Sequence, residues 1–309
     1  MENKQNLLKQ TYFTVLYLNC LNCPPTTFEV WHHSLEISQK FKRISFLEIV
    51  SSLEALQEKN RIINKKSFWV IKDKDSLAKQ RIVRQKNSLK KIKKIQNWVN
   101  IIKYLPFIRG VFVAGTLAFQ TSSQKSDWDV LVIMKKNRIW VGRLILTAFL
   151  FVIGKKRNRN DIQDRFCLNH FLAENNLIPQ IRNEYTACEF GFIFPILGKK
   201  LFNDFIRLNW NWSRRFSPNF EIINNFEEGF LVKEKRAKKI RDWFEKFLEI
   251  FGLANFLNDI CKKWMIKRIE KNPETFKEGA VIIYNDGELA FWPDFKGKDI
   301  LKKAVNFSN

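Results

Sequence analysis

Apolar positions recur along the chain with helical spacing in some stretches and in short strand-like runs in others. In the first part of the chain this pattern predicts three helices and then two strands, over residues 4–23, 28–38, 46–60, 61–63 and 68–71. Thr27 and Ser45 are expected to cap the second and third helices. Three helices followed by a hairpin is a winged-helix order, so we predict a winged-helix-like segment over residues 1–75.

The predicted third helix has the wrong charge for a helix that enters a DNA groove. It carries Glu48, Glu54 and Glu58, whereas a recognition helix meets phosphates with positive side chains. We therefore interpret the winged-helix-like segment as a docking or dimerisation module, with DNA binding as the alternative.

Residues 76–105 predict a long basic helix that contains nine Lys or Arg and no acidic residue. One face is apolar and expected to be buried, with Ile82, Leu89, Ile92, Ile95, Val99 and Ile102. The lysines are expected off this stripe: Lys79, Lys86, Lys90, Lys91, Lys93 and Lys94. Such a run is usually a solvated face. The absence of acids that would pair within the helix nevertheless favours contact with nucleic acid or another polyanion.

The rest of the chain predicts a central sheet and then a helical region. Strands are expected at residues 111–114, 130–134 and 166–172. The apolar run 144–153 is too short to cross a membrane and predicts a helix packed on the sheet, without stable membrane insertion. Further elements are expected from Asn183 or Thr186 to about Phe194, at 200–210, at 233–271 with a break at Gly252, as a hairpin at 280–292 turning at Asp286-Gly287, and as a helix at 298–305. The fold class is therefore α+β, with regions 1–75, 76–199 and 200–309.

The stretch from Val111 to Met134 contains the candidate chemistry. Asp127 and Asp129 open the second apolar run, and side chains two apart on a strand point to the same face. The two carboxylates are therefore expected to converge on one hard cation. Gly115 and Thr116 end the first run, where a following helix would offer free backbone N–H groups to phosphates.

This order of strand, Gly-Thr, spacer, Asp-x-Asp and strand resembles the DNA polymerase β-like nucleotidyltransferases, over roughly residues 95–200. Thr116 stands where that superfamily usually has Ser. Further motifs resemble an uncharacterised bacterial family that joins a winged-helix-like segment to such a domain: Ser126–Asp129, Arg138–Arg143, Phe166–Phe171 and Tyr185–Glu189.

The resemblance implies a mixed central sheet and a Mg²⁺-dependent (or Mn²⁺-dependent) transfer of a nucleoside monophosphate from an NTP to a hydroxyl group. It implies that Asp127 and Asp129 hold the metal and are catalytic, and that Gly115, Thr116 and Ser126 bind the nucleotide. The basic residues that follow the second strand would meet further phosphate charge: Lys135, Lys136, Arg138 and Arg143.

The family usually has a third carboxylate on a later strand, and alternation along residues 166–172 would place Cys167, Asn169 and Phe171 on one face. Asn169 then stands where the acid is expected, and an amide cannot accept a proton as a carboxylate does. Asp161, Asp164 and Glu174 flank the strand as replacements. The alternative is a catalytically inactive nucleotide- or nucleic-acid-binding regulator, and a third interpretation makes the two aspartates ordinary exposed residues of an interaction protein.

Composition sets outer limits on these interpretations. The 309 residues carry a formal net charge of +23, which favours a polyanionic partner. An odd count of five cysteines suits a reducing compartment, and the N-terminus lacks the form of a signal peptide, so we expect a cytoplasmic protein. Cys20 and Cys23 have zinc-ligand spacing, but packed thiols are the favoured interpretation. The acceptor, the preferred NTP, the oligomeric state and any toxin–antitoxin pairing stay open.

Overall fold

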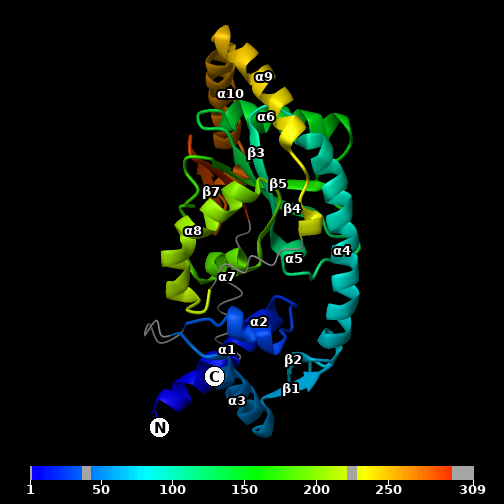
Figure 1. The fold of residues 1–309 in the computed structure, drawn as a ribbon, viewed down its shortest axis with the longest axis vertical. Helices are drawn as coiled ribbons and strands as arrows, with labels where there is room; N and C mark the ends of the chain where they lie inside the picture. Colours follow the sequence, from blue (N-terminus) through cyan, green and yellow to red (C-terminus); the bar gives the residue numbers. More distant parts are fainter. Residues whose placement is uncertain (1, 37–42, 221–227, 294–309) are drawn as a thin grey trace.

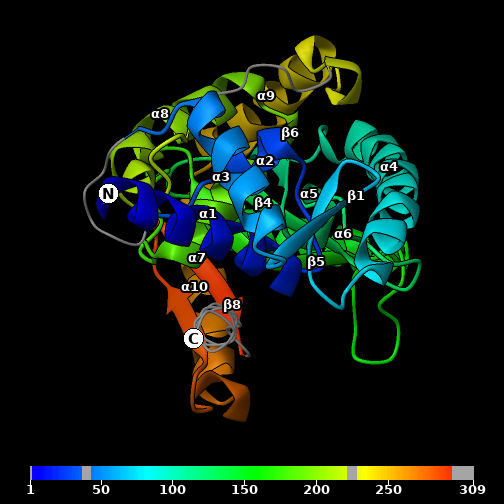
Figure 2. The same cartoon turned by 90° about the horizontal axis from the view of Figure 1, so that it is seen from below.

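The computed structural model describes residues 2–36, 43–220 and 228–293. The N-terminal part has the predicted order of helices and hairpin: α1 (Glu2–Cys20), α2 (Thr27–His32), α3 (Phe46–Glu58), β1 (Ile62–Lys65) and β2 (Phe68–Ile71). Ser45 caps α3 as predicted, and its side chain and that of Glu48 each accept a hydrogen bond from the other's backbone N–H. Figures 1 and 2 show this segment covering one end of the molecule.

Three predicted boundaries in this segment are wrong. The N-cap of α2 is Thr26, not Thr27, because Thr26 forms a complete capping box with Glu29. The helix ends at His32, well before residue 38, and residues 37 and 38 lie outside the described part of the chain. α1 ends at Cys20, three residues before the position predicted.

The long basic helix α4 (Ser76–Ile102) runs along the side of the molecule, from the N-terminal segment to the far end of the sheet (Figure 1). Its C-terminal half buries Ile92, Ile95, Val99 and Ile102, as the stripe predicts. Leu89 is exposed, contrary to the prediction. Lys91 is also misplaced by the sequence pattern, because it is buried and its Nζ donates to Asp164 Oδ1 at 2.6 Å.

Six strands of the described chain form one mixed sheet in the order β6-β3-β4-β5-β8-β7. Their bounds are β3 (Ile108–Val113), β4 (Trp128–Met134), β5 (Phe166–Ala173), β6 (Phe194–Leu197), β7 (Val281–Tyr284) and β8 (Glu288–Trp292). β4 and β5 are parallel, and the other neighbours are antiparallel. β6 corrects the sequence prediction, which had extended a helix to this point; Pro195 is tolerated there because β6 is an edge strand.

Helices cover both faces of the sheet. α4, α6 (Ile139–Val152) and α10 (Leu253–Glu270) pack on one face, where their apolar side chains join Val130 and Val132 in one core. α7 (Glu184–Phe192) and α8 (Lys199–Phe216) pack on the other face, in a core with Leu131 and Ile133. The short α5 (Gly115–Ala118) follows β3 directly, and α9 (Lys235–Ile250) precedes α10. Among the described helices, none has the length and apolarity needed to cross a membrane.

The C-terminal hairpin is part of the central sheet. It turns at Asp286-Gly287 as predicted, and β8 pairs with β5 through His170↔Ala290 and Leu172↔Glu288. The predicted break between α9 and α10 is also present, with Gly252 at φ +62°. The predicted helix at residues 298–305 lies outside the described residues.

Candidate functional site

A cavity of about 1160 Å³ opens where β4 and β5 begin and where β3 and β8 end. Its walls come from segments far apart in the sequence: the end of α1, the turn after β3, α6, the loop before β5, α7, α10 and β8. Four of the five residues that the sequence singles out as catalytic or nucleotide-binding line this cavity: Gly115, Thr116, Asp127 and Asp129. The fifth, Ser126, lies in the turn just before Asp127.

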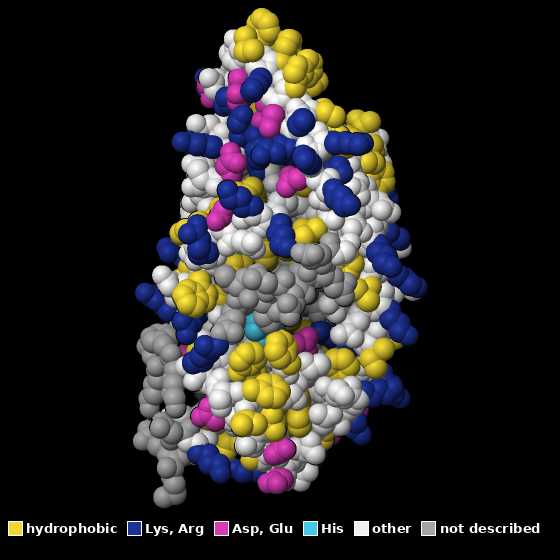
Figure 3. Space-filling model, in the orientation of Figure 1, with side chains coloured by type: hydrophobic (Ala, Val, Ile, Leu, Met, Phe, Trp, Pro, Cys, Tyr) yellow, Lys and Arg dark blue, Asp and Glu magenta, His cyan; other side chains and the backbone are white. Residues whose placement is uncertain are grey.

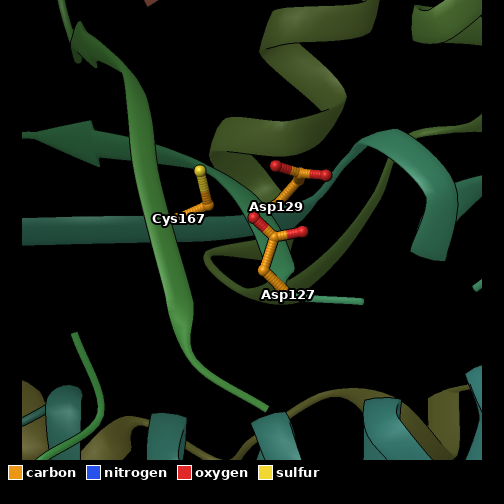
Figure 4. A group of neighbouring side chains, drawn as sticks. All are labelled: Asp127, Asp129 and Cys167. Carbon is orange, nitrogen blue, oxygen red and sulfur yellow. The ribbon is translucent and has the colours of Figure 1, made fainter. Parts of the chain in front are cut away.

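Asp127 and Asp129 lie on the same side of the chain at the start of β4, as strand alternation predicts. Figure 4 shows the thiol of Cys167, on the adjacent β5, turned toward both carboxylates. One ligand atom from each of these three residues lies within 4.8 Å of the others. The described chain therefore brings together a compact group of two carboxylates and one thiol that a single cation could contact.

Cys167, rather than Asn169, is the register partner of Asp129, although Asn169 also lines the cavity; a bulge in β5 follows Cys167. Asp129 pairs with Cys167 and Leu131 pairs with His170, so β5 has one extra residue between these pairs. Of the three residues predicted to share one face, Cys167 and Asn169 both line the cavity, and the prediction is wrong for Phe171. Phe171 packs on the opposite face with Val130, and His170 takes the cavity face in its place.

Gly115 permits the close approach of the turn after β3 to Asp129 on β4. Its φ is +58°, and an ideal Cβ at this position would lie 2.5 Å from Asp129 Oδ2. The N–H of Gly115 donates to Glu189 Oε1 on α7 at 3.1 Å. Glu189 thus joins the Gly-Thr turn to the carboxylate group, and burial raises the pKa of this side chain.

The carboxylates of Asp127, Asp129 and Glu189 repel one another, and burial strengthens the effect on Asp129. Burial, the Asp127 carboxylate and the Glu189 carboxylate together raise the pKa of Asp129 to about 7. The same surroundings act on Tyr185, whose pKa is raised by Glu189, by burial and by Asp129. A bound cation would stabilise this group of carboxylates, because it offsets their mutual repulsion.

Arg157 is the protein's own positive charge at the carboxylate group. Its Nη1 lies 2.8 Å from Asp127 Oδ2 and donates to Cys167 Sγ at 3.0 Å. The contact with Asp127 is an ion pair without hydrogen-bond geometry, so among the described residues Asp127 Oδ2 is a buried oxygen without a hydrogen-bond donor. Arg157 comes from the partly exposed loop between α6 and β5, and its side chain is 42% exposed.

The hydroxyl groups predicted to bind nucleotide already have protein partners. Thr116 Oγ1 is 3.1 Å from Ser122 Oγ. Ser126 Oγ accepts from the Ser123 N–H at 3.0 Å and closes the turn before β4. Thr116 lines the cavity and is placed to contact a ligand, whereas Ser126 shapes the turn that presents Asp127.

The three acids considered as replacements for the third carboxylate are engaged elsewhere. Asp161 pairs with Arg165, and Asp164 accepts from Lys91 and Lys94. Glu174 accepts from the Lys136 N–H at 3.1 Å. Glu189 is a carboxylate that does lie beside the aspartates. In the sequence, only its place in the Tyr185–Glu189 motif pointed to it, because it is far from the Asp pair along the chain.

Three further cations line the cavity near β8 and α10: Arg143, Lys156 and Arg268. The Arg143 guanidinium stacks 4.2 Å from the centroid of the Phe291 ring, and burial and the charge of Arg268 lower the pKa of Arg143 to about 10. Burial, Arg268 and Arg143 likewise lower the pKa of Lys156. In the described chain none of the three makes an ion pair with a carboxylate, so this side of the cavity attracts anions.

The other basic residues after β4 do not line the cavity: Lys136 is exposed, and Lys135 and Arg138 contact acids of α9. Lys135 Nζ lies 3.1 Å from Glu245 and 2.6 Å from Glu249, both on α9. Arg138 is buried and its guanidinium lies 4.0 Å from Glu249. Of the four basic residues predicted to meet phosphate charge, Arg143 lines the cavity.

Cys20 and Cys23 lie in different environments. Cys20 lines the cavity, whereas Cys23 is buried beside the Arg81 guanidinium and 3.6 Å from the carbonyl of Phe119. Burial raises the pKa of the Cys23 thiol to about 12. Arg81 also donates to Glu29 at 2.7 Å, so Cys23 belongs to a buried polar contact between the N-terminal segment and the core.

Comparison of this chain with protein-family models, with curated proteins and with solved structures finds no match.

Proposed function

We propose that this protein is a divalent-metal-dependent nucleotidyltransferase that moves a nucleoside monophosphate from an NTP to a hydroxyl group. The observation that carries the proposal is the convergence of Asp127 and Asp129 at the start of β4, inside a cavity large enough for two substrates. Gly115 supports it further, because its backbone lies against the Asp129 carboxylate and the next residue, Thr116, lines the same cavity.

The residues at the carboxylate group suit Mg²⁺ or Mn²⁺. Hard cations take oxygen ligands, and Asp127 and Asp129 offer them from one strand. Cys167 is a poor ligand for Mg²⁺, because burial and the two aspartates raise the pKa of its thiol and keep it protonated. A bound divalent ion would supply charge stabilisation as pyrophosphate leaves.

The remaining cavity residues have matching roles in the proposal. Arg143, Lys156 and Arg268 would hold negatively charged groups of the substrates, since they lack carboxylate partners in the described chain. Glu189 is our candidate for the base that accepts the proton of the acceptor hydroxyl, because it lines the cavity close enough to Asp129 to act on it, and burial raises its pKa.

A second function on the same fold is a catalytically inactive nucleotide-binding regulator. Two observations favour it: Cys167 stands at the position across from Asp129, where a third acid would complete the site, and Arg157 already neutralises Asp127. In such a protein the cavity would bind a nucleotide without turnover.

The test is release of labelled pyrophosphate from each of the four γ-labelled NTPs, with Mg²⁺ or Mn²⁺ and with cell RNA or a small-molecule extract as acceptor. The double variant Asp127→Asn/Asp129→Asn removes the metal ligands, and Glu54→Gln/Asp204→Asn is a control that neutralises two acids outside the cavity. Release by the wild type and the control, with loss in the Asp127/Asp129 variant, supports the transferase. Metal-dependent NTP binding without release supports the regulator, and absence of both rejects the two proposals together.

A further inference from the structure

Helix α9 packs against the core with its charged face, not with its apolar face. Its buried positions are Ala237, Arg241 and Glu245. The Glu245 side chain is 2% exposed, and it accepts from Arg109 Nη2 at 2.5 Å, from the Phe107 N–H at 2.6 Å and from Lys135 Nζ at 3.1 Å. Ion pairs therefore attach α9 to the core, which leaves its apolar face free for another contact.

The apolar face of α9 points outward and continues across the turn onto α10. Trp243 is 66% exposed, Ile250 is 78% exposed and Phe251 is 63% exposed. We call this surface the aromatic tip, and its exposed members are Ile240, Trp243, Phe244, Phe247, Ile250, Phe251, Leu253, Phe256, Leu257, Ile260 and Trp264. Figure 3 shows hydrophobic side chains gathered at the end of the molecule where the α9–α10 hairpin projects in Figure 1. So large a contiguous apolar surface marks an interaction site.

Basic side chains flank the aromatic tip. Exposed cations on the same two helices are Lys235, Arg236, Lys238, Lys239, Lys246, Lys263 and Lys267. Two acids of α9, Glu245 and Glu249, bind Lys135, and although Asp259 and Glu270 of α10 are exposed, exposed cations outnumber exposed acids on the two helices. An exposed apolar face bordered by Lys and Arg, with Trp and Phe among its apolar residues, has the composition of an interfacial membrane anchor.

We infer that the aromatic tip is a docking surface for an anionic lipid bilayer, to which the protein binds peripherally. Charge complementarity selects this occupant: the cations attract anionic headgroups, while the aromatic rings enter the headgroup and acyl boundary. A second copy of this chain would bring the same cations face to face, which costs free energy.

Docking at the aromatic tip would bring the cavity close to the membrane. Trp264 belongs to both, because it is 49% exposed on α10 and also lines the cavity. Arg268, one turn further along α10, is one of the cavity's free cations. The inference itself stands on the surface alone and does not depend on the transferase proposal.

The test is co-flotation of the full-length protein with vesicles of phosphatidylcholine alone or of phosphatidylcholine mixed with phosphatidylglycerol. The tip variant Trp243→Ser/Phe247→Ser/Phe251→Ser replaces exposed side chains and leaves the Glu245 contacts in place. The matched control Phe28→Ser/Phe46→Ser/Leu47→Ser replaces exposed apolar side chains of the N-terminal segment. Circular dichroism checks that each variant is folded.

We expect the wild type and the control to float with the anionic vesicles, and the tip variant to bind them at least about tenfold more weakly. The charge variant Lys238→Glu/Lys239→Glu/Lys246→Glu should lose the preference for anionic over zwitterionic vesicles. Failure of the wild type to bind anionic vesicles, or equal binding by the tip variant, would overturn the inference. A lipid-independent dimer that the tip variant abolishes would also overturn it, in favour of a second copy.

Discussion

Gly115, the first residue of α5, is in contact with Asp129 of β4, and the contact leaves no room for a side chain on Gly115. A Cβ built there would lie 2.5 Å from Asp129 Oδ2 and 3.0 Å from Asp129 Cγ, on a backbone with φ at +58°. The position of Asp129, the candidate metal ligand, therefore already requires a glycine at residue 115, whether or not a nucleotide binds there.

Gly115→Ala should destabilise the protein by about 2–4 kcal/mol, because it adds a clash with Asp129 to the cost of a left-handed backbone. Gly252→Ala is the matched control, since Gly252 has φ at +62° and no atom within 4 Å of its Cβ position. The control should lose only about 1 kcal/mol in urea unfolding. Equal losses would show that the Asp129 contact contributes nothing.

The raised pKa of Asp129 predicts a pH-dependent stability. Its folded-state pKa of about 7 lies above the ordinary value of 3.8, so the folded protein holds this proton more tightly than the unfolded chain. Stability from this group is complete below the ordinary pKa and is lost as pH rises toward 7. Asp129→Asn does not titrate, so it should remove this part of the slope and be more stable than the wild type at pH 8, by roughly 1–2 kcal/mol.

Urea unfolding of the wild type and Asp129→Asn between pH 4 and pH 8 measures this difference. Added Mg²⁺ should stabilise the wild type at pH 8 and leave Asp129→Asn nearly unchanged, because only the ionised carboxylate binds the metal. Parallel pH profiles for the two proteins would contradict the assignment of the raised pKa.

Cys167→Asp should create a three-carboxylate group, because Cys167 pairs with Asp129 across β4 and β5. Without metal, the added charge should lower the melting temperature at pH 8; with Mg²⁺ or Mn²⁺ that loss should be reversed, and metal affinity should rise by about tenfold. Asn169→Asp is the control at the position that sequence alternation favoured. Asn169 lines the cavity but does not pair with Asp129, so similar metal affinities for the two variants would show that this pairing does not decide which residue completes the group.

Glu245→Gln should cost about 3 kcal/mol, because it removes the buried negative charge that Arg109 and Lys135 share. Arg109, the Phe107 N–H and Lys135 hold the pKa of Glu245 below its usual value against the effect of burial. The stability that Glu245 contributes is therefore present above its ordinary pKa and lost as pH falls through the lowered one. Glu249→Gln, at a side chain that is 37% exposed, should cost less than about 1 kcal/mol.

Local chemistry was sufficient to predict most elements and the first members of the site. The Ser45 cap, the break at Gly252 and the turn at Asp286-Gly287 are short-range effects, so their residues specify them without the rest of the fold. The common face of Asp127 and Asp129 follows in the same way from the two-residue period of a strand.

The tertiary structure decided which residues from distant parts of the chain come into contact. One extra residue in β5 reverses the faces of the strand after Cys167, and alternation carries no sign of a bulge that forms against a neighbouring strand. Glu189, Arg157 and Arg268 reach the cavity from three separate segments. Lys91 is buried because Asp164 comes to it from a distant loop, and α9 turns its aromatic face outward because Arg109 and Lys135 hold Glu245. A sequence shows which face of a helix is apolar; the partners supplied by the rest of the chain determine which face is buried.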